Sequence, residues 1–221
     1  MKYIEKNESP NEFEIWKDYH NPSNWNQLNG KRSNNPEERV PDYSKEELRQ
    51  ALIEEQFYTC AYCECSIPTN STKLRIDHVL PRLGDSETDR IFDYGNMVLS
   101  CSGYFTENGS RVPRVLICDP SKENYPLPIT PLQVDCESHF KFSEIGSING
   151  ISAIAEATIK ILNLNHSKLD NLRKAVIDGF LFDDLKNQVY LKNEEYQGLL
   201  EQISESQEYK TAITQILQAL I

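Results

Sequence analysis

The sequence predicts an α+β protein in which a small cysteine-rich core is embedded in a mainly helical chain. Three observations support this prediction: two short strand-like runs near the middle, helical patterns on both sides of them, and cysteines gathered around the strands. The 221 residues are enough to bury a sizeable hydrophobic core. With 38% hydrophobic and 26% charged residues, the composition is that of a globular chain.

The first predicted segment, residues 1–57, is a polar arm followed by a helix. Ser44 and Glu47 form the pattern of a capping box, and apolar residues follow at roughly helical spacing from Leu48 to Phe57. We therefore expect a helix that begins after Ser44 and leads to Cys60. Four large apolar residues are the expected anchors of the arm on the core: Trp16, Tyr19, Trp25 and Leu28.

The second predicted segment, residues 58–125, is the core. Its runs "KLRIDHV" and "MVLSC" are typical of short strands, because they are apolar and are bounded by turn-forming residues. A polar loop from Gly84 to Gly95 separates them. Gly, Pro, Asn and Ser are frequent between residues 102 and 128, so this stretch is expected to be mostly loop.

The third predicted segment, residues 126–221, is mainly helical. From about Gly150, apolar residues recur in three stripes at helical spacing, which predicts amphipathic helices. The stripes are Ile151, Ile154, Ala155, Thr158, Ile159 and Leu162, then Leu169, Leu172, Val176, Ile177 and Phe180, then Ile213, Ile216, Leu217 and Leu220. We expect these helices to pack on the core and to bind a partner protein.

The chain lacks the marks of a membrane or secreted protein. It has no run of about eighteen apolar residues, and its first residues, "MKYIEKNESPNEF", lack the apolar core of a signal peptide. A cytoplasmic location without membrane contact is therefore expected. In that compartment, the six cysteines are expected to be metal ligands or buried thiols rather than disulfides.

The net charge of -11 restricts how this chain can meet nucleic acid. Phosphate contacts dominate the affinity of nucleic-acid binders, and such proteins are usually basic. We expect that this chain binds nucleic acid weakly alone, or that a partner supplies the positive surface.

The motif "CAYC", Cys60 to Cys63, predicts half of a structural zinc site. Two thiolates at this spacing can reach one ion at about 2.3 Å, and structural zinc takes four such ligands in a tetrahedron. A redox CxxC is disfavoured, because a helix precedes the motif and no thioredoxin-like strand–helix–strand pattern follows. Cys65 lies too close to Cys63 to join the same turn.

Two pairs compete for the other half of the zinc site. Cys101 with Cys118 is one pair, and Cys136 with His139 is the other. Spacing alone does not choose between them. Any single cysteine is also compatible with the role of a small buried apolar residue.

Between the cysteine halves the sequence resembles the HNH endonucleases of the His-Me finger class. The ordered motifs that carry the resemblance are "CAYC", "IDHVLPR", "NMVLSC" and "CDPSK". The resemblance implies a ββα-metal core that is stabilised by structural zinc. The segments "EEQFYTCAYCE", "LPITPLQVDCESHFKF" and "TIKILNLNHSKLDNLRKAVIDG" resemble the HNH subunit of the Septu antiphage system and its retron-associated relatives, which works with an ATPase partner of the SMC/ABC type. This likeness extends from the first residues to about Gly179.

The resemblance assigns roles to four residues of this chain. It implies that His78 is the general base, that Asp77 and Asp119 hold a catalytic divalent ion, and that Asn96 orients the loop after the histidine strand. A neutral His can take a proton from water at pH 7. An oxygen ligand pair suits Mg²⁺ or Mn²⁺. Side chains of neighbouring strand residues point to opposite faces, so Asp77 and His78 can cooperate only at a strand end, which Pro81 marks.

The chain departs from the family pattern after Cys101, where the expected close second cysteine is missing. An inserted loop with Cys118 as the fourth ligand keeps the family order. Asp119 followed by Pro120 is also typical of a helix N-cap, which is the alternative to metal ligation. For His78 the alternative is a core histidine bonded to Asp77.

The leading hypothesis from the sequence is a metal-dependent HNH endonuclease that hydrolyses nucleic acid, with DNA favoured over RNA, and acts in antiphage defence with an ATPase partner. The competing hypothesis is a non-catalytic, zinc-stabilised adaptor that binds a partner through its helical half. The net negative charge and the unusual spacing after Cys101 favour the adaptor. The Asp-His pair with a downstream Asn and Asp disfavours it.

Overall fold

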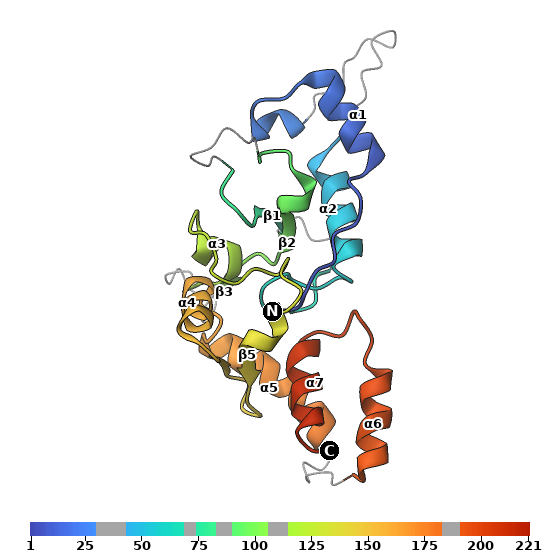
Figure 1. Ribbon diagram of the computed structural model, residues 1–221, viewed down its shortest axis with the longest axis vertical. Coiled ribbons are helices and arrows are strands. Elements are labelled where there is room, and N and C mark those ends of the chain that lie inside the picture. The colour runs from blue at the N-terminus through green and yellow to red at the C-terminus, as the bar shows by residue number, and fades with distance from the viewer. Residues whose placement is uncertain (30–42, 69–73, 83–89, 106–114, 183–190) are drawn as a thin grey trace.

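The computed structural model describes residues 1–29, 43–68, 74–82, 90–105, 115–182 and 191–221. The molecule is elongated. The N-terminal helices and the strand pair β1–β2 lie toward one end, and α6 and α7 lie at the other (Figure 1). The expected mixture of helices and small sheets is confirmed as an α+β architecture, with helices on both sides of the cysteine-rich middle.

The N-terminal segment contains α1 (Asn11–His20), the 3-10 helix η1 (Trp25–Asn29) and α2 (Lys45–Glu55). The capping box that the sequence predicts at Ser44 is confirmed: Ser44 accepts from the Glu47 amide, and the Glu47 carboxylate accepts from the Ser44 amide. The helix ends earlier than the apolar spacing predicts, because Phe57 has a positive φ of 51° and lies at the surface.

The predicted anchors of the arm are correct except for one. Trp16 and Leu28 are buried and Trp25 is half-buried, but Tyr19 is 62% exposed. Tyr19 lies in the last turn of α1, beyond the buried residues Phe13 and Trp16. The arm is therefore held by the first half of α1 and by η1.

The predicted strands are confirmed as β1 (Arg75–His78) and β2 (Met97–Ser100), which pair antiparallel with His78 opposite Met97. The 3-10 helix η2 (Tyr94–Asn96) leads into β2, and α3 (Cys118–Lys122) follows later. Of the predicted loop from Gly84 to Gly95, residues 84–89 lie outside the described residues; the rest is turn and 3-10 helix. The strand β1 carries Asp77 and His78, and α3 carries Cys118 and Asp119.

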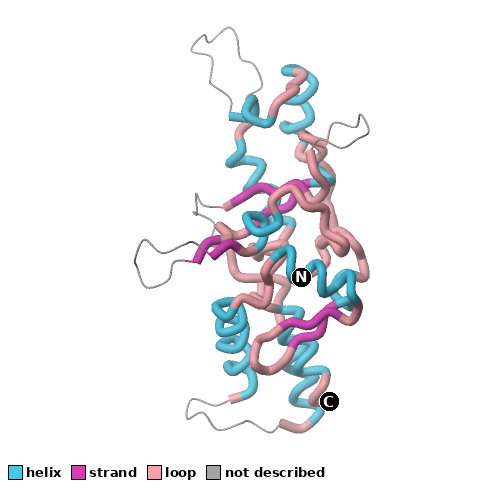
Figure 2. Tube along the Cα trace, turned by 90° about the vertical axis from the view of Figure 1, so that its left-hand side faces the viewer, coloured by secondary structure: helices cyan, strands magenta, loops and turns pink. Residues whose placement is uncertain are grey.

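Two further strand pairs are short, and the sequence pattern did not predict them. β3 (Tyr104–Phe105) pairs with β4 (Val115–Leu116), and β5 (Phe140–Phe142) pairs with β6 (Ile148–Gly150), both antiparallel. The three pairs lie at different levels along the long axis (Figure 2). Strands of two or three residues are too short to give a periodic signal.

The C-terminal segment contains α4 (Ala153–Leu162), α5 (Ser167–Leu181), α6 (Asn193–Gln202) and α7 (Lys210–Gln218). The three predicted helical stripes fall in or beside α4, α5 and α7, but α6 was not predicted, since Tyr196 is its one buried residue. The stripes also include residues that the structure exposes: Ile151 at 58%, Ile154 at 52% and Leu172 at 45%.

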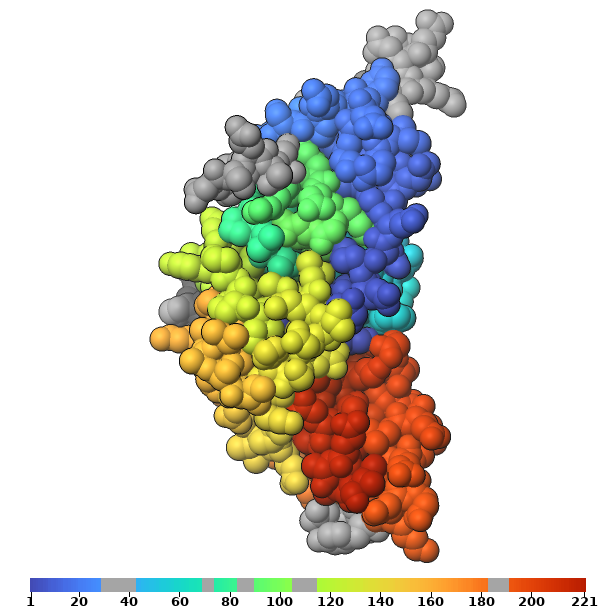
Figure 3. All heavy atoms as spheres, in the orientation of Figure 1, coloured from blue at the N-terminus to red at the C-terminus, as the bar shows by residue number. Residues whose placement is uncertain are grey.

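Two hydrophobic clusters stabilise the described chain. The first runs from Met1 to Leu169 and joins residues of all three predicted segments. The stretch before α1 packs on the middle of the chain, where the Ile4 amide donates to the Pro131 carbonyl at 2.8 Å. In Figure 3 this stretch lies beside the yellow central residues, with the C-terminal helices below. The second cluster is built by α5, α6, α7 and Tyr209. The division at residues 57 and 125 stays a prediction.

None of the helices in the described residues combines the length and apolar character that crossing a membrane requires.

Candidate metal centre and catalytic site

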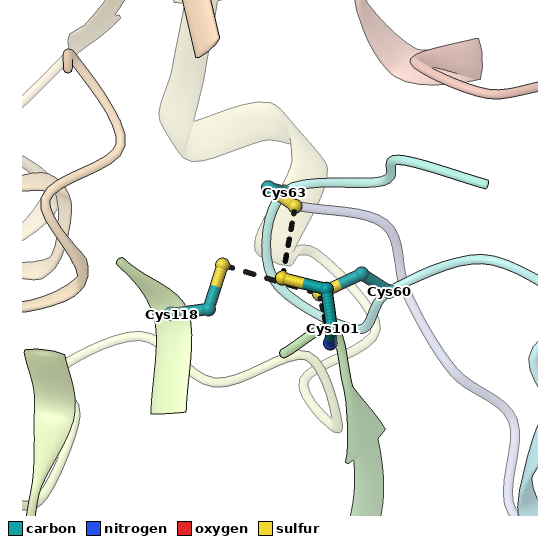
Figure 4. A group of neighbouring side chains, drawn as sticks. All are labelled: Cys60, Cys63, Cys101 and Cys118. Atoms are coloured by element: carbon teal, nitrogen blue, oxygen red, sulfur yellow. Dashed lines mark hydrogen bonds between the residues drawn. The ribbon is translucent and has the colours of Figure 1, made fainter. Parts of the chain in front are cut away.

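Four cysteine side chains converge on one point. The sulfur atoms of Cys60, Cys63, Cys101 and Cys118 all lie within 4.8 Å of one another. The Cys60 sulfur is 4.0 Å from that of Cys118, and the Cys63 sulfur is 3.9 Å from that of Cys101 (Figure 4). A tetrahedral zinc ion with bonds of about 2.3 Å requires sulfur–sulfur separations of about 3.8 Å. The group therefore has the donors and the dimensions of a structural zinc centre.

The four ligands come from three places in the chain. Cys60 and Cys63 lie on the turn after α2, where the Glu64 amide donates to the Cys60 carbonyl at 3.0 Å and Glu64 has a φ of 63°. Cys101 directly follows β2, and its amide donates to the Cys60 sulfur at 3.3 Å. Such N–H donors favour thiolate over thiol, because they stabilise the negative charge.

Cys118 completes the group because α3 approaches the end of β2 closely. Gly103 has a φ of 67°, and a Cβ there would clash with the ring of Pro120 and lie 2.6 Å from the Ile117 carbonyl oxygen. The Ile117 amide donates to the Gly103 carbonyl at 3.0 Å. The turn at Gly103 thus brings Cys118 close to Cys101.

The thiols influence one another's protonation. Burial alone would raise the pKa of Cys60, but the neighbouring thiols of Cys101 and Cys118 hold it well below its ordinary value. The Cys118 thiol lowers the pKa of Cys101 to about 6. The group therefore carries negative charge at neutral pH that a divalent cation would neutralise.

The competing ligand pair is not part of this group. Within the described residues, the group of four is the one gathering of three or more potential metal ligands, and it omits Cys136 and His139. Cys136 is buried, and His139 pairs with Asp135 at 3.4 Å. Cys65 also stays outside the group of four, as its closeness to Cys63 in sequence predicts.

Asp77 and His78 lie at the end of β1, and both are buried. Both line a pocket of about 270 Å³, together with Arg82, Asp119 and Lys122. Both residues are paired with β2, Asp77 opposite Val98 and His78 opposite Met97, and the strand ends at His78. The structure therefore gives both residues access to one pocket.

The His78 ring is held in one tautomer. Its Nε2 lies 2.9 Å from the carbonyl oxygen of Ile91. A carbonyl can only accept, so Nε2 carries the proton and the neutral ring keeps its lone pair on Nδ1. The Trp25 ring packs against His78 at a centroid distance of 4.9 Å and an interplanar angle of 82°. Burial lowers the pKa of His78 to about 4.

This shift predicts that the contribution of His78 to stability depends on pH. As the pH falls from 6.5 toward 4, the unfolded chain takes up a proton that the folded chain excludes from His78. The contribution of His78 to the free energy of unfolding should therefore fall by about 3 kcal/mol over this window, at about 1.4 kcal/mol per unit, while the raised pKa of Asp77 contributes in the opposite direction. Nuclear magnetic resonance of the histidine rings should find His78 neutral at pH 5.5; a titration midpoint near 6.5 would contradict the assignment.

Tyr62, which sequence reasoning missed, and Lys122 hold the Asp77 carboxylate. The Tyr62 hydroxyl donates to one oxygen, and the buried Lys122 ammonium lies 3.2 Å from the other. Lys122 also donates to the His78 carbonyl at 2.9 Å. Burial raises the pKa of Asp77 to about 6, and Lys122 opposes this shift. The "CDPSK" motif placed Lys122 near the site, but nothing in the sequence pattern indicated Tyr62.

Lys122→Met should destabilise the fold, because it leaves the buried Asp77 carboxylate without its cation. We expect a loss of about 3–5 kcal/mol in the free energy of unfolding, measured by urea denaturation. Asp77→Asn combined with Lys122→Met should lose clearly less than the sum of the single changes. Lys160→Met, at an exposed position on α4, is the control. Additive losses would show that the two groups do not interact.

Asn96 fixes the turn after β1. Its side-chain oxygen accepts from the Leu80 amide at 2.8 Å, and its nitrogen donates to the Leu80 carbonyl at 3.0 Å. Its backbone carbonyl accepts from the Val79 amide at 2.9 Å. Asn96 thus contacts the two residues that directly follow His78, and it orients the strand end without lining the pocket.

Asp119 lies in the first turn of α3 and does not cap it. Ile117 is the N-cap residue, and no side chain makes a capping hydrogen bond there. The capping alternative for Asp119 is therefore wrong; its carboxylate accepts from the Arg75 guanidinium instead. The negative charge of Asp119 contributes to the raised pKa of Asp77. Both carboxylates line the same pocket.

The comparisons with known proteins give one distant similarity. No protein-family model matches the chain. The chain is 28% identical over 131 residues to "Septu protein PtuB" of Bacillus thuringiensis, an alignment that covers 59% of this chain. It spans about half the length of that relative, 45%. The similarity supports a relationship to Septu proteins.

Proposed function

We propose that this protein is a metal-dependent HNH endonuclease that acts as the effector of an antiphage defence system. The observation that carries the proposal is His78: its Nε2 is bound by a backbone carbonyl, and the residue lines a pocket shared with Asp77 and Asp119. A histidine held only for packing does not require two carboxylates in the same pocket. The similarity to a Septu protein supports the defence role.

His78 acts as the general base. The hydrogen bond to Ile91 fixes Nδ1 as the atom that takes the proton from water. The lowered pKa keeps the ring neutral, and thus able to accept, throughout the neutral range. Asn96 maintains the position of the strand end through its three hydrogen bonds around Leu80 and Val79.

Asp77 and Asp119 are the residues that would hold the catalytic divalent ion. An ionised carboxylate offers about four acceptor positions, and the described contacts use two on Asp77 and one on Asp119, so both retain capacity for a cation. When bound, Mg²⁺ or Mn²⁺ supplies charge stabilisation to the transition state and the leaving 3′ oxygen. Lys122 and Tyr62 orient the Asp77 carboxylate, and Arg75 orients that of Asp119.

The arrangement of elements supports a ββα-metal core. β1 and β2 form the antiparallel pair, α3 follows in the chain, and the cysteine group joins the end of β2 and the start of α3 to the turn after α2. The zinc would be structural, because four protein ligands leave no open position for a reacting group.

An ATPase partner of the SMC/ABC type and a cytoplasmic location complete the proposal. The net charge of -11 disfavours association with nucleic acid. A partner would supply the affinity, and the helices α6 and α7, which belong to the second hydrophobic cluster, are the surface we assign to it.

The test is cleavage by purified protein, alone and with the co-expressed neighbouring ATPase. DNA and RNA substrates are incubated with Mg²⁺, with Mn²⁺ and with a chelator that leaves the zinc content unchanged. We expect divalent-ion-dependent cleavage in the presence of the partner. Equal cleavage with and without the divalent ion would contradict the metal assignment.

A zinc-stabilised adaptor is the second candidate function. It is favoured by the ion pairs of Asp77 with Lys122 and of Asp119 with Arg75, which satisfy both carboxylates within the protein. The adaptor predicts one zinc ion for each chain, partner binding, and no cleavage of DNA or RNA with any divalent ion.

A further inference from the structure

Two cationic side chains pack on the face of an aromatic ring that lies beside His78. Trp25 in η1 packs on the His78 ring, and two cations from distant segments approach the Trp25 ring. The Lys45 ammonium, at the start of α2, is 5.0 Å from its centroid. The Arg82 guanidinium, after β1, is 5.8 Å from it. We name Trp25, Lys45 and Arg82 the Trp25 platform.

The platform concentrates positive charge in an acidic chain. Arg49, one turn after Lys45 on α2, pairs with Glu46 at 3.0 Å, whereas within the described part of the chain no carboxylate pairs with Lys45 or Arg82. Arg49 and Arg82 both lower the pKa of Lys45, after the effect of its own burial. Like charges held together repel, and the attraction of each cation to the aromatic ring offsets only part of this repulsion. A bound anion would relieve the repulsion.

Arg82 connects the platform to the reaction pocket. It lines the pocket that contains Asp77, His78 and Asp119, and it also lies over the Trp25 ring. An anion on the platform is therefore directly adjacent to whatever occupies the pocket. A polymer with a phosphate at each repeat places one phosphate in the pocket and the next beside it.

We propose that the Trp25 platform binds a backbone phosphate of the nucleic acid next to the phosphate that is cleaved. The inference rests on the proposed function and adds a subsite to it. Arg82 and Lys45 donate to the phosphate oxygens, and Trp25 holds the two cations together beside His78. Because the platform contacts phosphate rather than bases, it positions the strand without selecting its sequence.

We expect the Trp25 platform to contribute to substrate binding rather than to the chemical step. The proposal assigns Lys45 and Arg82 to the neighbouring phosphate, so their removal should raise KM for a short oligonucleotide much more than it lowers kcat. It should also reduce the salt dependence of binding, by about 0.7–0.9 in the logarithmic slope for each phosphate that the variant no longer binds. A purely structural role for the two side chains would leave that slope unchanged.

The experiment measures binding of DNA and RNA oligonucleotides, single- and double-stranded, over a range of salt concentrations. Lys45→Met, Arg82→Met and the double variant are made in a His78→Asn background, with the partner present, so that the substrate stays intact. Lys160→Met is the matched control. Zinc content and thermal unfolding are measured for each variant.

The double variant should bind at least tenfold more weakly and lose about one unit of the salt slope, equally for DNA and RNA, while Lys160→Met changes neither. An unchanged slope in a folded double variant, or no binding of nucleic acid by the background protein, would overturn the subsite. If the salt slope changes but the wild-type protein never cleaves nucleic acid, the phosphate subsite is supported and the nuclease function is contradicted. If the wild-type protein cleaves through His78 and the salt slope is unchanged, only the phosphate subsite is contradicted.

Discussion

Cys118→Ser protein is expected to lose its zinc and most of its stability. Cys118 supplies one of four sulfur atoms that lie within 4.8 Å of one another, and it is fully buried at the start of α3. Structural zinc contributes about 10–16 kcal/mol in small zinc-binding peptides, which is as much as the whole stability of a typical domain, about 5–15 kcal/mol. Metal analysis of the purified protein and thermal unfolding measure both effects.

Cys136→Ser and His139→Ala are the matched controls for this prediction. Cys136 is as buried as Cys118, so its replacement tests whether removal of any buried thiol destabilises the fold equally. Both controls should retain one zinc ion for each chain. Loss of zinc from either control, with zinc retained in Cys118→Ser, would show that the fourth ligand belongs to the other pair.

His78→Ala is expected to lower the rate of nucleic-acid cleavage by about 10²–10⁴-fold, because no other group replaces the general base. His78→Asn is a second variant, since its larger side chain leaves less empty space beside Trp25 than alanine does. Single-turnover cleavage with Mg²⁺ and the partner present is the measurement. Zinc content should stay at the wild-type value in both variants.

The same assay needs a histidine that has no role in the site. His139→Ala serves again, because His139 lies in η3 (Cys136–His139) and contacts Asp135 rather than the pocket. It should cleave at the wild-type rate. A His78→Asn protein that also cleaves at that rate would exclude His78 as the base.

The parts of the fold that could be predicted from the sequence are those with local signals. The capping box at Ser44 requires only residues three positions apart, and the two strands around His78 and Val98 are short apolar runs between turn residues. β5 and β6 were missed because each has three residues, and α6 because it buries little beyond Tyr196. The exposed Ile151 and Ile154 show that spacing alone does not decide burial.

In the candidate site, too, the predictable features are those with a local signal in the sequence. The four cysteines could be proposed from their order, although the choice of Cys118 depended on the family resemblance and only the structure brings it to the group. Tyr62 and Lys122 lie 15 and 45 positions from Asp77, and their contact with it follows from tertiary packing. Trp25 was predicted as an anchor of the arm, with no indication that it would reach His78.

In the proposed reaction, water activated by His78 attacks the phosphorus of a nucleic-acid backbone. Cleavage in water enriched in ¹⁸O, followed by mass spectrometry of the products, shows whether water attacks the phosphorus and which oxygen leaves. If a divalent ion held by Asp77 and Asp119 assists the leaving 3′ oxygen, each cut should place one ¹⁸O atom in the 5′-phosphate product and none on the 3′ hydroxyl. Products ending in a cyclic 2′,3′-phosphate, or 5′ ends without ¹⁸O, would contradict the mechanism.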